Sequence, residues 1–430
     1  MRRILISTAV ILLVSGLSNY VFAVSGENFE YHGYFRSGIG SNSKGGDQTC
    51  FSNGGNGGGN EFRIGNECTT YGEVAFTGHH LKGKGPNAPF FKSQFRMAFE
   101  VEAHSDYEQD QGDKGPAFRE VYVEGGNLDG IPLSYWAGKR FYRDQDAFIS
   151  DWYYMSDLSA PGAGFGNIPF LGLGKAHIAY IKRVDDSAQT DIGYVSHNVY
   201  DLRIKDIKIP DLGSVQLWLA YANNPSSRNL TNGTTYSDNE GLAGGFLFSQ
   251  SILGGFNNFS IVYGRGLMQG LNIYGTTLTE YQSDAQYDQE DSSRIRIVDH
   301  ATFSLSPELE LHGIAAIELR DNGSLTDSKE NWYSIGVQPV YKVTDHYQLV
   351  SVLGHSQVEA DKQNTRRLTR FTLAPQVTAG RSIWARPVFR VFYTRTWWNE
   401  ANKGRVESGT SAYRNTDHAS SWGFQGEVWF

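Results

Sequence analysis

The sequence predicts an all-β fold, and specifically a transmembrane antiparallel β-barrel with well over a dozen strands. Three observations lead to this prediction. The last ten residues (SWGFQGEVWF) alternate between two faces, similar segments recur along the chain between turn-rich intervals, and the first residues have the composition of an export signal. An outer-membrane barrel has this pattern because lipid contacts one face of each strand and a wet lumen contacts the other.

The beginning of the chain is expected to be removed during export. Two arginines precede the apolar run at residues 4–14, and a small residue, Ala23, lies at the expected cleavage position. These are the features of a secretory signal peptide. The run is too short for a transmembrane helix, which needs about 20 apolar residues. We therefore expect a signal peptide at residues 1–23 and a single barrel domain at residues 24–430.

The composition favours one continuous β architecture. The chain has 49 glycines, 12 prolines and 13% aromatic residues, which is typical of an ordered β protein rather than a disordered one. No Pro-rich, Ser-rich or charge-block segment divides the sequence into separate domains. The net charge of −8 argues against nucleic acid as a partner.

Segments that alternate between apolar and polar residues predict the individual strands. In order, they cover residues 29–39, 69–77, 95–103, 294–305, 333–343, 347–352, 368–377, 385–396 and 421–430. The intervals between them are rich in Gly, Asn, Asp and Ser, which predict turns and loops. Residues 189–250 alternate poorly, so the strand boundaries there stay open.

A secreted β-sandwich that binds carbohydrate is the alternative, because sandwich strands also alternate. Charged residues in the middle of the predicted strands argue against it. These residues are Glu100, Glu102, Arg294, Arg296, Arg370, Arg386 and Arg390. The final strand, whose apolar face ends on the aromatic Phe430, and the export signal also favour the barrel.

No motif in the chain predicts an enzyme, a metal site or a cofactor. The two cysteines, Cys50 and Cys68, favour one loop disulfide, because their count is even and their separation short in an exported chain. His79 and His80 have no third ligand at a recognisable spacing. Asp146 and Asp151 could form a glycosidase pair, but the guidance of a solute is the simpler interpretation.

Four aromatic residues share the predicted wet faces with charged neighbours. They are Tyr34, Tyr71, Trp384 and Trp429. Any one of them could instead belong to an interfacial belt, but four on separate strands favour a common role. A sugar ring has an apolar C–H face that stacks on aromatics, and its hydroxyl rim bonds to charged groups. The pattern therefore indicates a path for oligosaccharides.

Several strings in the chain are similar to strings of the maltoporins, a family of sugar-specific outer-membrane porins. They are YHGYFRSG at 31–38, RIGNECTTY at 63–71, PAFRE at 116–120, WAGKRFY at 136–142, DWYY at 151–154, PGAG at 161–164, SIWARP at 382–387 and EVWF at 427–430. They occur in the same order as in the family. The chain therefore resembles this family from end to end.

The resemblance implies an 18-stranded barrel in the bacterial outer membrane, a homotrimer, and a third loop that folds inward as a constriction. It also implies passive diffusion of maltose and maltodextrins along aromatic residues, called here the aromatic slide. The slide positions are Tyr34, Tyr71, Phe259, Trp384 and Trp429. The polar track and constriction positions are Arg36, Arg63, Glu73, Arg119, Asp146, Asp151 and Tyr153. Cys50 and Cys68 match the disulfide of the first loop.

The chain departs from the family at three positions that bear on sugar preference. Gln111 stands where the family has a tryptophan at the mouth of a neighbouring subunit's channel, Asp144 replaces an arginine, and Phe148 replaces a histidine. Sucrose or another oligosaccharide is therefore the alternative substrate.

The external loops are a surface that a bacteriophage could use as its receptor.

Overall fold

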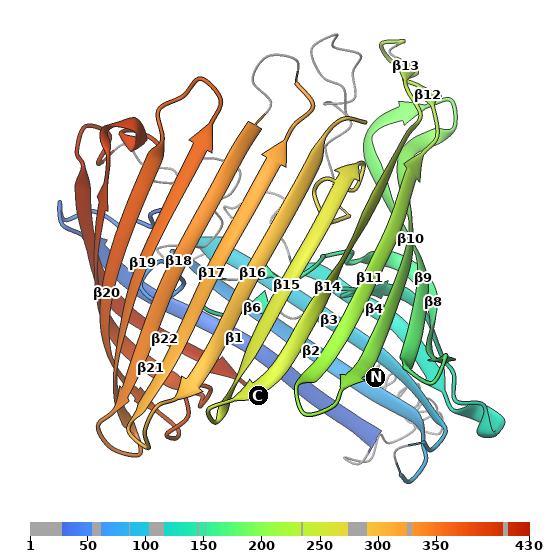
Figure 1. Cartoon of the computed structure of the whole chain (residues 1–430), viewed down its shortest axis with the longest axis horizontal. Coiled ribbons are helices and arrows are strands. Elements are labelled where there is room, and N and C mark those ends of the chain that lie inside the picture. Colours follow the sequence, from blue (N-terminus) through green and yellow to red (C-terminus); the bar gives the residue numbers. More distant parts are fainter. Residues whose placement is uncertain are drawn as a thin grey trace, which may run out of the picture.

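The computed structural model is a closed antiparallel barrel of 18 strands (Figure 1). The structure describes residues 28–53, 62–85, 87–102, 116–143, 146–150, 152–233, 235–273, 290–324, 329–406 and 412–430. The predicted signal peptide lies outside these ranges. In the described residues no helix is long and apolar enough to cross a membrane.

Each barrel strand pairs with the next along the chain, and β22 pairs with β1 to close the ring. The strands are β1 (Phe29–Asn42), β2 (Thr69–Lys82), β3 (Phe90–Glu102), β4 (Ala117–Gly126), β5 (Ser134–Arg140), β8 (Ala160–Phe170), β9 (Gly174–Thr190), β10 (Gly193–Ile209), β11 (Gly213–Asn224), β14 (Asn239–Ile252), β15 (Gly255–Gly266), β16 (Ser293–Ser304), β17 (Leu309–Asp321), β18 (Lys329–Lys342), β19 (Tyr347–Ala360), β20 (Arg366–Thr378), β21 (Val388–Trp398) and β22 (His418–Trp429). Closure leaves no unpaired edge among the described strands of the barrel, as a barrel in lipid requires.

Short elements accompany the barrel. They are the strand pairs β6 (Asp146–Ala147) with β7 (Trp152–Tyr153) and β12 (Ser227–Arg228) with β13 (Thr235–Tyr236), and the 3₁₀ helices η3 (Leu128–Gly130) and η5 (Glu400–Asn402). The connections differ in length between the two ends of the barrel. Residues 253–254 join β14 to β15, whereas residues 267–292 join β15 to β16. We call the end with the short connections, such as residues 253–254, the turn end, and the end with the long connections, such as residues 267–292, the loop end.

The predicted alternation is confirmed, and strand β21 illustrates its cause. Its outward side chains, such as Phe389 and Tyr393, are exposed on the barrel surface, whereas Arg390 and Thr394 are buried inside. The outward row can contact lipid while the inward row keeps polar groups in the lumen. The closed barrel rules out the alternative of a β-sandwich.

The poor alternation of residues 189–250 has a cause in β10, whose pairing with both neighbouring strands is interrupted. Between β9 and β10 the register shifts at Tyr194 and Val195, where the extra residues belong to β9, and between β10 and β11 it shifts from Ile204 to Ile207, where the extra residue belongs to β10. Each extra residue moves the following side chains to the opposite face, so a strict period of two fails across it. Four barrel strands nevertheless occupy this region: the end of β9, all of β10 and β11, and most of β14.

The predicted strand at residues 385–396 begins too early. Strand β21 starts at Val388, and the preceding residues form a turn in which the Ala385 amide donates to the Ser382 carbonyl at 2.9 Å. Pro387 explains the boundary, because its nitrogen has no hydrogen to donate to a neighbouring strand. Trp384 therefore lies in a turn and not on a strand.

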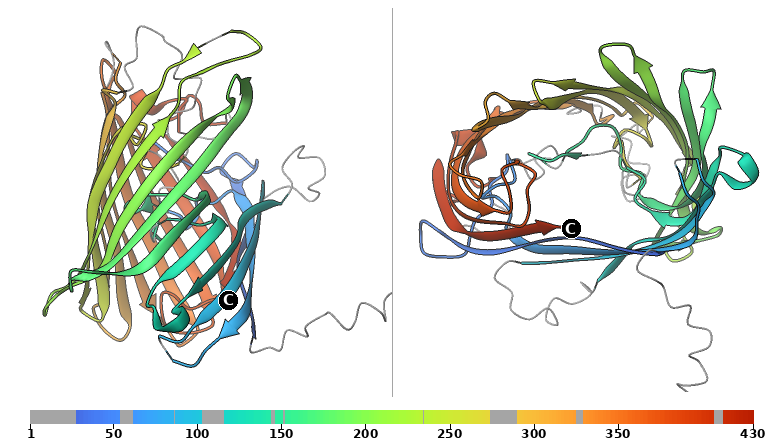
Figure 2. Two further views of the ribbon diagram at one scale, coloured as in Figure 1. Left: turned by 90° about the vertical axis from the view of Figure 1, so that its right-hand side faces the viewer. Right: turned by 90° about the horizontal axis from the view of Figure 1, so that it is seen from below.

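The segment between β5 and β8 folds into the barrel, where Figure 2 shows it inside the ring of strands. Its apolar side chains Ile149, Met155 and Leu158 are almost fully buried. The carbonyl of Tyr154 accepts a hydrogen bond from Ser260 of β15 at 2.9 Å. This is the inward constriction loop that the sequence resemblance implied.

Candidate functional site

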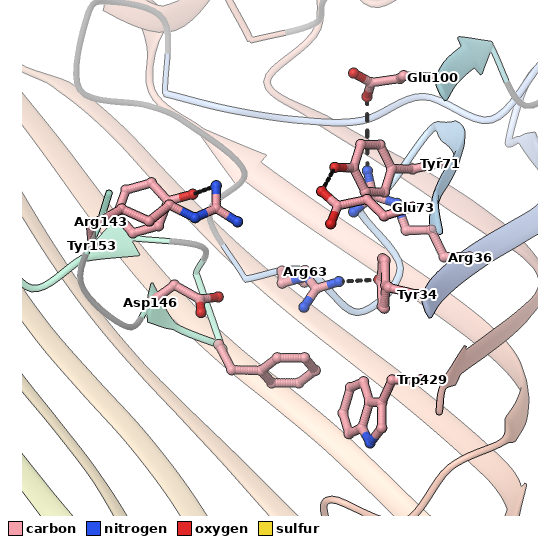
Figure 3. A pocket seen from close by; sticks show the side chains of 11 residues that line it. Tyr34, Arg36, Arg63, Tyr71, Glu73, Glu100, Arg143, Asp146, Tyr153 and Trp429 are labelled. Atoms are coloured by element: carbon pink, nitrogen blue, oxygen red, sulfur yellow. Dashed lines mark hydrogen bonds and ion pairs between the residues drawn. The ribbon is translucent and has the colours of Figure 1, made fainter. Parts of the chain in front are cut away.

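The inward loop and the wall formed by β1, β2 and β22 enclose a cavity of about 410 Å³. Figure 3 shows most of its lining side chains pointing toward one another. The lining residues are Tyr34, Arg36, Arg63, Tyr71, Glu73, Glu100, Arg143, Asp146, Phe148, Tyr153 and Trp429. Eight of the predicted slide, track and constriction residues are thus brought to one place.

Three predicted slide residues form one row: Tyr71, Tyr34 and Trp429. We call it the loop-end row because it begins with Tyr71 near the loop end of β2; it extends to Trp429, the last residue of β22. Tyr34 in β1 lies directly opposite Trp429 in β22, and the ring centroids of Tyr34 and Tyr71 are 6.0 Å apart. Residues opposite each other in an antiparallel pair point to the same face. The strand register therefore places these three rings side by side on the lumen wall.

A second group of aromatic rings, the turn-end pair, consists of Trp384 and Phe256. Their rings are stacked with centroids 6.4 Å apart. Trp384 is held in its turn by a hydrogen bond from its amide to the Ser382 hydroxyl at 3.1 Å. The structure thus brings Trp384 to the lumen as predicted. Its position is set by the turn before β21, however, and not by the alternation of side chains along a strand.

The prediction that Phe259 lies in the slide is wrong. Phe259 pairs with Phe248 on the outer face of the barrel, and its ring contacts Phe246 at 6.1 Å. Ser260, which bonds to the inward loop, fixes the opposite phase as the lumen face. Phe256 shares that phase and takes the position beside Trp384.

The sequence does hold a signal for this arrangement. Of the two phases in residues 256–263, the one with Phe259, Ile261 and Tyr263 is the more apolar. Lipid selects the more apolar phase, which leaves Phe256 on the lumen side.

Two buried carboxylates, Glu67 and Glu427, tie the arginines of the polar track together. Glu67 accepts hydrogen bonds from Arg36 at 2.5 Å and from Arg63 at 2.7 Å. Arg63 also lies 3.3 Å from Glu427, which accepts a further bond from Arg390 at 2.7 Å. The shared guanidinium of Arg63 joins both carboxylates in one network beside the loop-end row.

The pKa of Glu67, which lies in a loop outside the strands, is shifted by this network. Burial alone would raise the pKa of its carboxyl group, but the positive charges of Arg63 and Arg36 outweigh burial and lower it. The carboxyl group is therefore ionised at neutral pH. Glu67 was not among the predicted site residues, although it lies within one of the strings that resemble the family.

The predicted track continues from Tyr71 along β2. The Tyr71 hydroxyl donates to Glu73, and Arg96 of β3 links Glu73 to Glu120 through two hydrogen bonds of 2.7 Å. Arg119 lies over the ring of Phe141 at 5.1 Å. The hydrogen-bonding side chains of the polar track therefore continue past the cavity, through Arg96 and Glu120, to Arg119 beside the inward loop.

The inward loop contributes its own polar groups. Asp146 lies opposite Tyr153 in the β6–β7 pair, and the Tyr153 hydroxyl accepts a hydrogen bond from Arg143 at 2.5 Å. The predicted track residue Asp151 lies outside the described residues, as do Gln111 and Asp144.

The Cys50–Cys68 disulfide is present and confirms the predicted pairing. It closes the loop between β1 and β2, whose returning end carries Arg63 and Glu67 into the lumen. Arg63 is further held by its amide, which donates to the Ile149 carbonyl of the inward loop at 3.1 Å. The loop's polar side chains thus reach the cavity from a fixed backbone.

Comparisons with known proteins agree with this architecture. The model of the LamB porin family matches residues 29–430. The outer membrane channel DcaP of Acinetobacter baumannii is similar with a TM-score of 0.50 and 11% identity, over 94% of this chain and 99% of that chain. OccAB1 of Acinetobacter baumannii has a TM-score of 0.48 and 9% identity, over 96% and 98%. At this identity, the likeness to DcaP shows the barrel fold alone.

Proposed function

The chain belongs to the LamB porin family and lies in the bacterial outer membrane as a multi-pass β-barrel, and we propose that it conducts maltose and maltodextrins by facilitated diffusion. The loop-end row of Tyr71, Tyr34 and Trp429 carries this proposal. The three rings lie in a row on the same face of the lumen wall beside a charged network. Aromatic surfaces of this kind stack on the C–H faces of successive glucosyl rings.

The charged network would exchange hydrogen bonds with the sugar hydroxyls as the chain advances. Its guanidinium groups donate, and its carboxylates accept, so each hydroxyl meets a partner of either kind. The carboxylates Glu67 and Glu427 are already paired with Arg63. Binding stays weak at each position, as conduction requires release as well as capture. No chemical step and no energy input are needed.

Conductance of single channels in a planar bilayer tests this function. Maltohexaose is titrated while the ion current is recorded, with sucrose as the comparison. We expect concentration-dependent block by maltohexaose. Open channels that no concentration of either sugar blocks would overturn the proposal.

A channel for sucrose or another oligosaccharide is the second candidate. Phe148 favours it, because an aromatic ring on the inward loop lies against the slide where the family has a histidine. Block by sucrose at concentrations at which maltohexaose has no effect would select this candidate.

We further propose a homotrimer whose contacts use the outer faces of β1–β4. Aromatic side chains with ring centroids 4.9–6.5 Å apart cover this surface. They are Phe29, Tyr31, Phe35, Phe76, Phe95, Phe99, Phe118 and Phe430. Three equal steps in the block of one conducting unit would support a trimer, and one step would contradict it. The loops at the loop end would then be the surface open to a bacteriophage.

A further inference from the structure

Phe148 lies on the inward loop with its backbone held on both sides. Its neighbours Ala147 and Ile149 are 0% and 1% exposed. The Ser150 amide donates to the Ala147 carbonyl at 2.9 Å, and the Arg63 amide donates to the Ile149 carbonyl. These contacts tie the backbone on both sides of Phe148, so rotation about the side-chain bonds is the smallest movement that displaces the ring. The ring itself lines the cavity.

The ring of Phe148 touches one member of each aromatic group. It lies 5.7 Å from Trp429 of the loop-end row at an interplanar angle of 87°, and 5.3 Å from Trp384 of the turn-end pair at 68°. Both contacts are edge-to-face arrangements, which aromatic pairs prefer. Phe148 therefore occupies the place where a solute would pass from one group to the other.

Charged and aromatic neighbours hold the ring in this place. The guanidinium of Arg63 lies 4.4 Å from the ring centroid and that of Arg386 lies 5.6 Å away. The ring of His312 is nearly parallel to Phe148, with centroids 6.4 Å apart. These contacts favour the observed rotamer, because a cation over an aromatic face is attracted to it.

We propose that Phe148 limits the length of the saccharide that this channel binds well. A short saccharide fits in the cavity of about 410 Å³ and stacks on the loop-end row without moving the ring. A longer chain must also lie on Trp384, and it must first turn Phe148 away from both tryptophans. This inference rests on the proposed function, because it concerns the same aromatic path.

Phe148→Ala tests the proposal, with the dissociation constants of maltose and maltohexaose measured by current block. We expect maltohexaose to bind about tenfold more tightly to the variant, a change of about 1.4 kcal/mol. Maltose should change by less than about twofold. Phe148→Leu, which keeps apolar bulk at the site and guards against a misfolded loop, should shift maltohexaose in the same direction by a smaller factor.

Two further variants serve as controls. Phe259→Ala makes the same change on the outer face of the barrel and should leave both constants unchanged. Phe148→Ala combined with Trp384→Ala should lose the gain for maltohexaose, because the turn-end pair is then incomplete.

The outcomes separate this inference from the proposed function. If the wild type is blocked but Phe148→Ala and Phe148→Leu keep the wild-type ratio of the two constants, Phe148 does not select by length and only this inference is overturned. Equal weakening of both sugars would make Phe148 an ordinary stacking residue and would also overturn it. A wild-type channel that neither sugar blocks overturns the proposed function and this inference together.

Discussion

Individual residues at the border of the cavity bring opposite charges into direct contact. The side chains of Glu67 and Glu427 are both only 1% exposed. Each is paired with more than one guanidinium, and Gln425 also donates to Glu67 at 2.9 Å. Buried charges of this kind are tolerated because every charge has a partner and further hydrogen bonds. The side chains are therefore held in fixed positions beside the aromatic row.

Replacement of Trp429 by alanine should weaken saccharide binding without closing the channel. Trp429 lines the cavity opposite Tyr34, and loss of one stacking surface costs about 1 kcal/mol, or roughly five- to tenfold in affinity. Current block by maltohexaose measures the affinity, and small-ion conductance should stay similar or rise. Trp397→Ala, which changes an exposed outward tryptophan, is the control. Unchanged affinity in Trp429→Ala would remove this residue from the slide.

The ionisation of Glu67 should make stability depend on pH in the acid range. Its pKa in the folded protein is lower than the ordinary value of 4.5, because Arg63 and Arg36 outweigh the effect of burial. Its contribution to the free energy of unfolding is thus complete above pH 4.5 and is lost as the pH falls through the lowered pKa.

Thermal unfolding in detergent at a series of acidic pH values measures this effect. We expect Glu67→Gln to be less stable than the wild type at neutral pH and to lose less stability on acidification. Equal losses in both proteins would show that Glu67 does not contribute to the acid sensitivity.

Among the structural elements, strands β18 and β19 form a notch that positions the returning part of the first loop. Gly336 and Gly354 lie opposite each other in these strands. A Cβ atom on either glycine would come within 2.2 Å of the ring of Phe62, which is 1% exposed. Phe62 immediately precedes Arg63. Two glycines in the wall therefore help to hold the loop that supplies the charged network.

Gly336→Ala should destabilise the barrel and disturb the cavity. The new methyl group would overlap the ring of Phe62 at 1.9 Å, and overpacking of this kind costs about 1–3 kcal/mol. We expect a lower unfolding temperature and weaker binding of maltohexaose, because Arg63 would move with Phe62. Gly313→Ala in the neighbouring strand meets its nearest atom at 3.7 Å and should have a much smaller effect. Similar behaviour of the two variants would contradict this role of the notch.

In the whole molecule, the constriction depends on how the inward loop is fastened to the barrel wall. Asp201 of β10 accepts hydrogen bonds from Tyr142 at 2.9 Å, near the beginning of the loop, and from Arg203 at 3.0 Å. Arg203 in turn donates to Ser156, near the end of the loop, at 3.0 Å. Trp218 of β11 also donates to Asp201, at 2.7 Å. One buried carboxylate thus connects both ends of the loop to the wall.

Asp201→Asn should loosen the loop while the barrel remains closed. The substitution removes the negative charge beside the buried Arg203 guanidinium, and breaking a buried ion pair in this way costs about 3–5 kcal/mol. We expect a lower unfolding temperature and noisier single-channel currents. Asp211→Asn, at an exposed turn, should leave both quantities unchanged. Quiet, wild-type currents in Asp201→Asn would show that the loop is fastened by other contacts.

The sequence alone determined the barrel and the lumen-facing side of the three residues of the loop-end row. Lipid on one side and water on the other impose a period of two on each strand, and this period is visible without any structure. It identified the lumen face that carries Tyr34, Tyr71 and Trp429. Where a bulge shifts the phase, as in β10, the same reasoning failed because the period no longer holds.

Only the tertiary structure decided how distant segments meet in the lumen. The turn that carries Trp384, the stacking of Trp384 on Phe256, and the place of Phe148 between the two aromatic groups depend on contacts across the barrel. Glu67 reaches the network because its loop folds back into the lumen. The alternation of side chains along a strand shows which face of the barrel each side chain takes. The contacts between a loop and the barrel strands depend instead on residues that are far apart in the sequence.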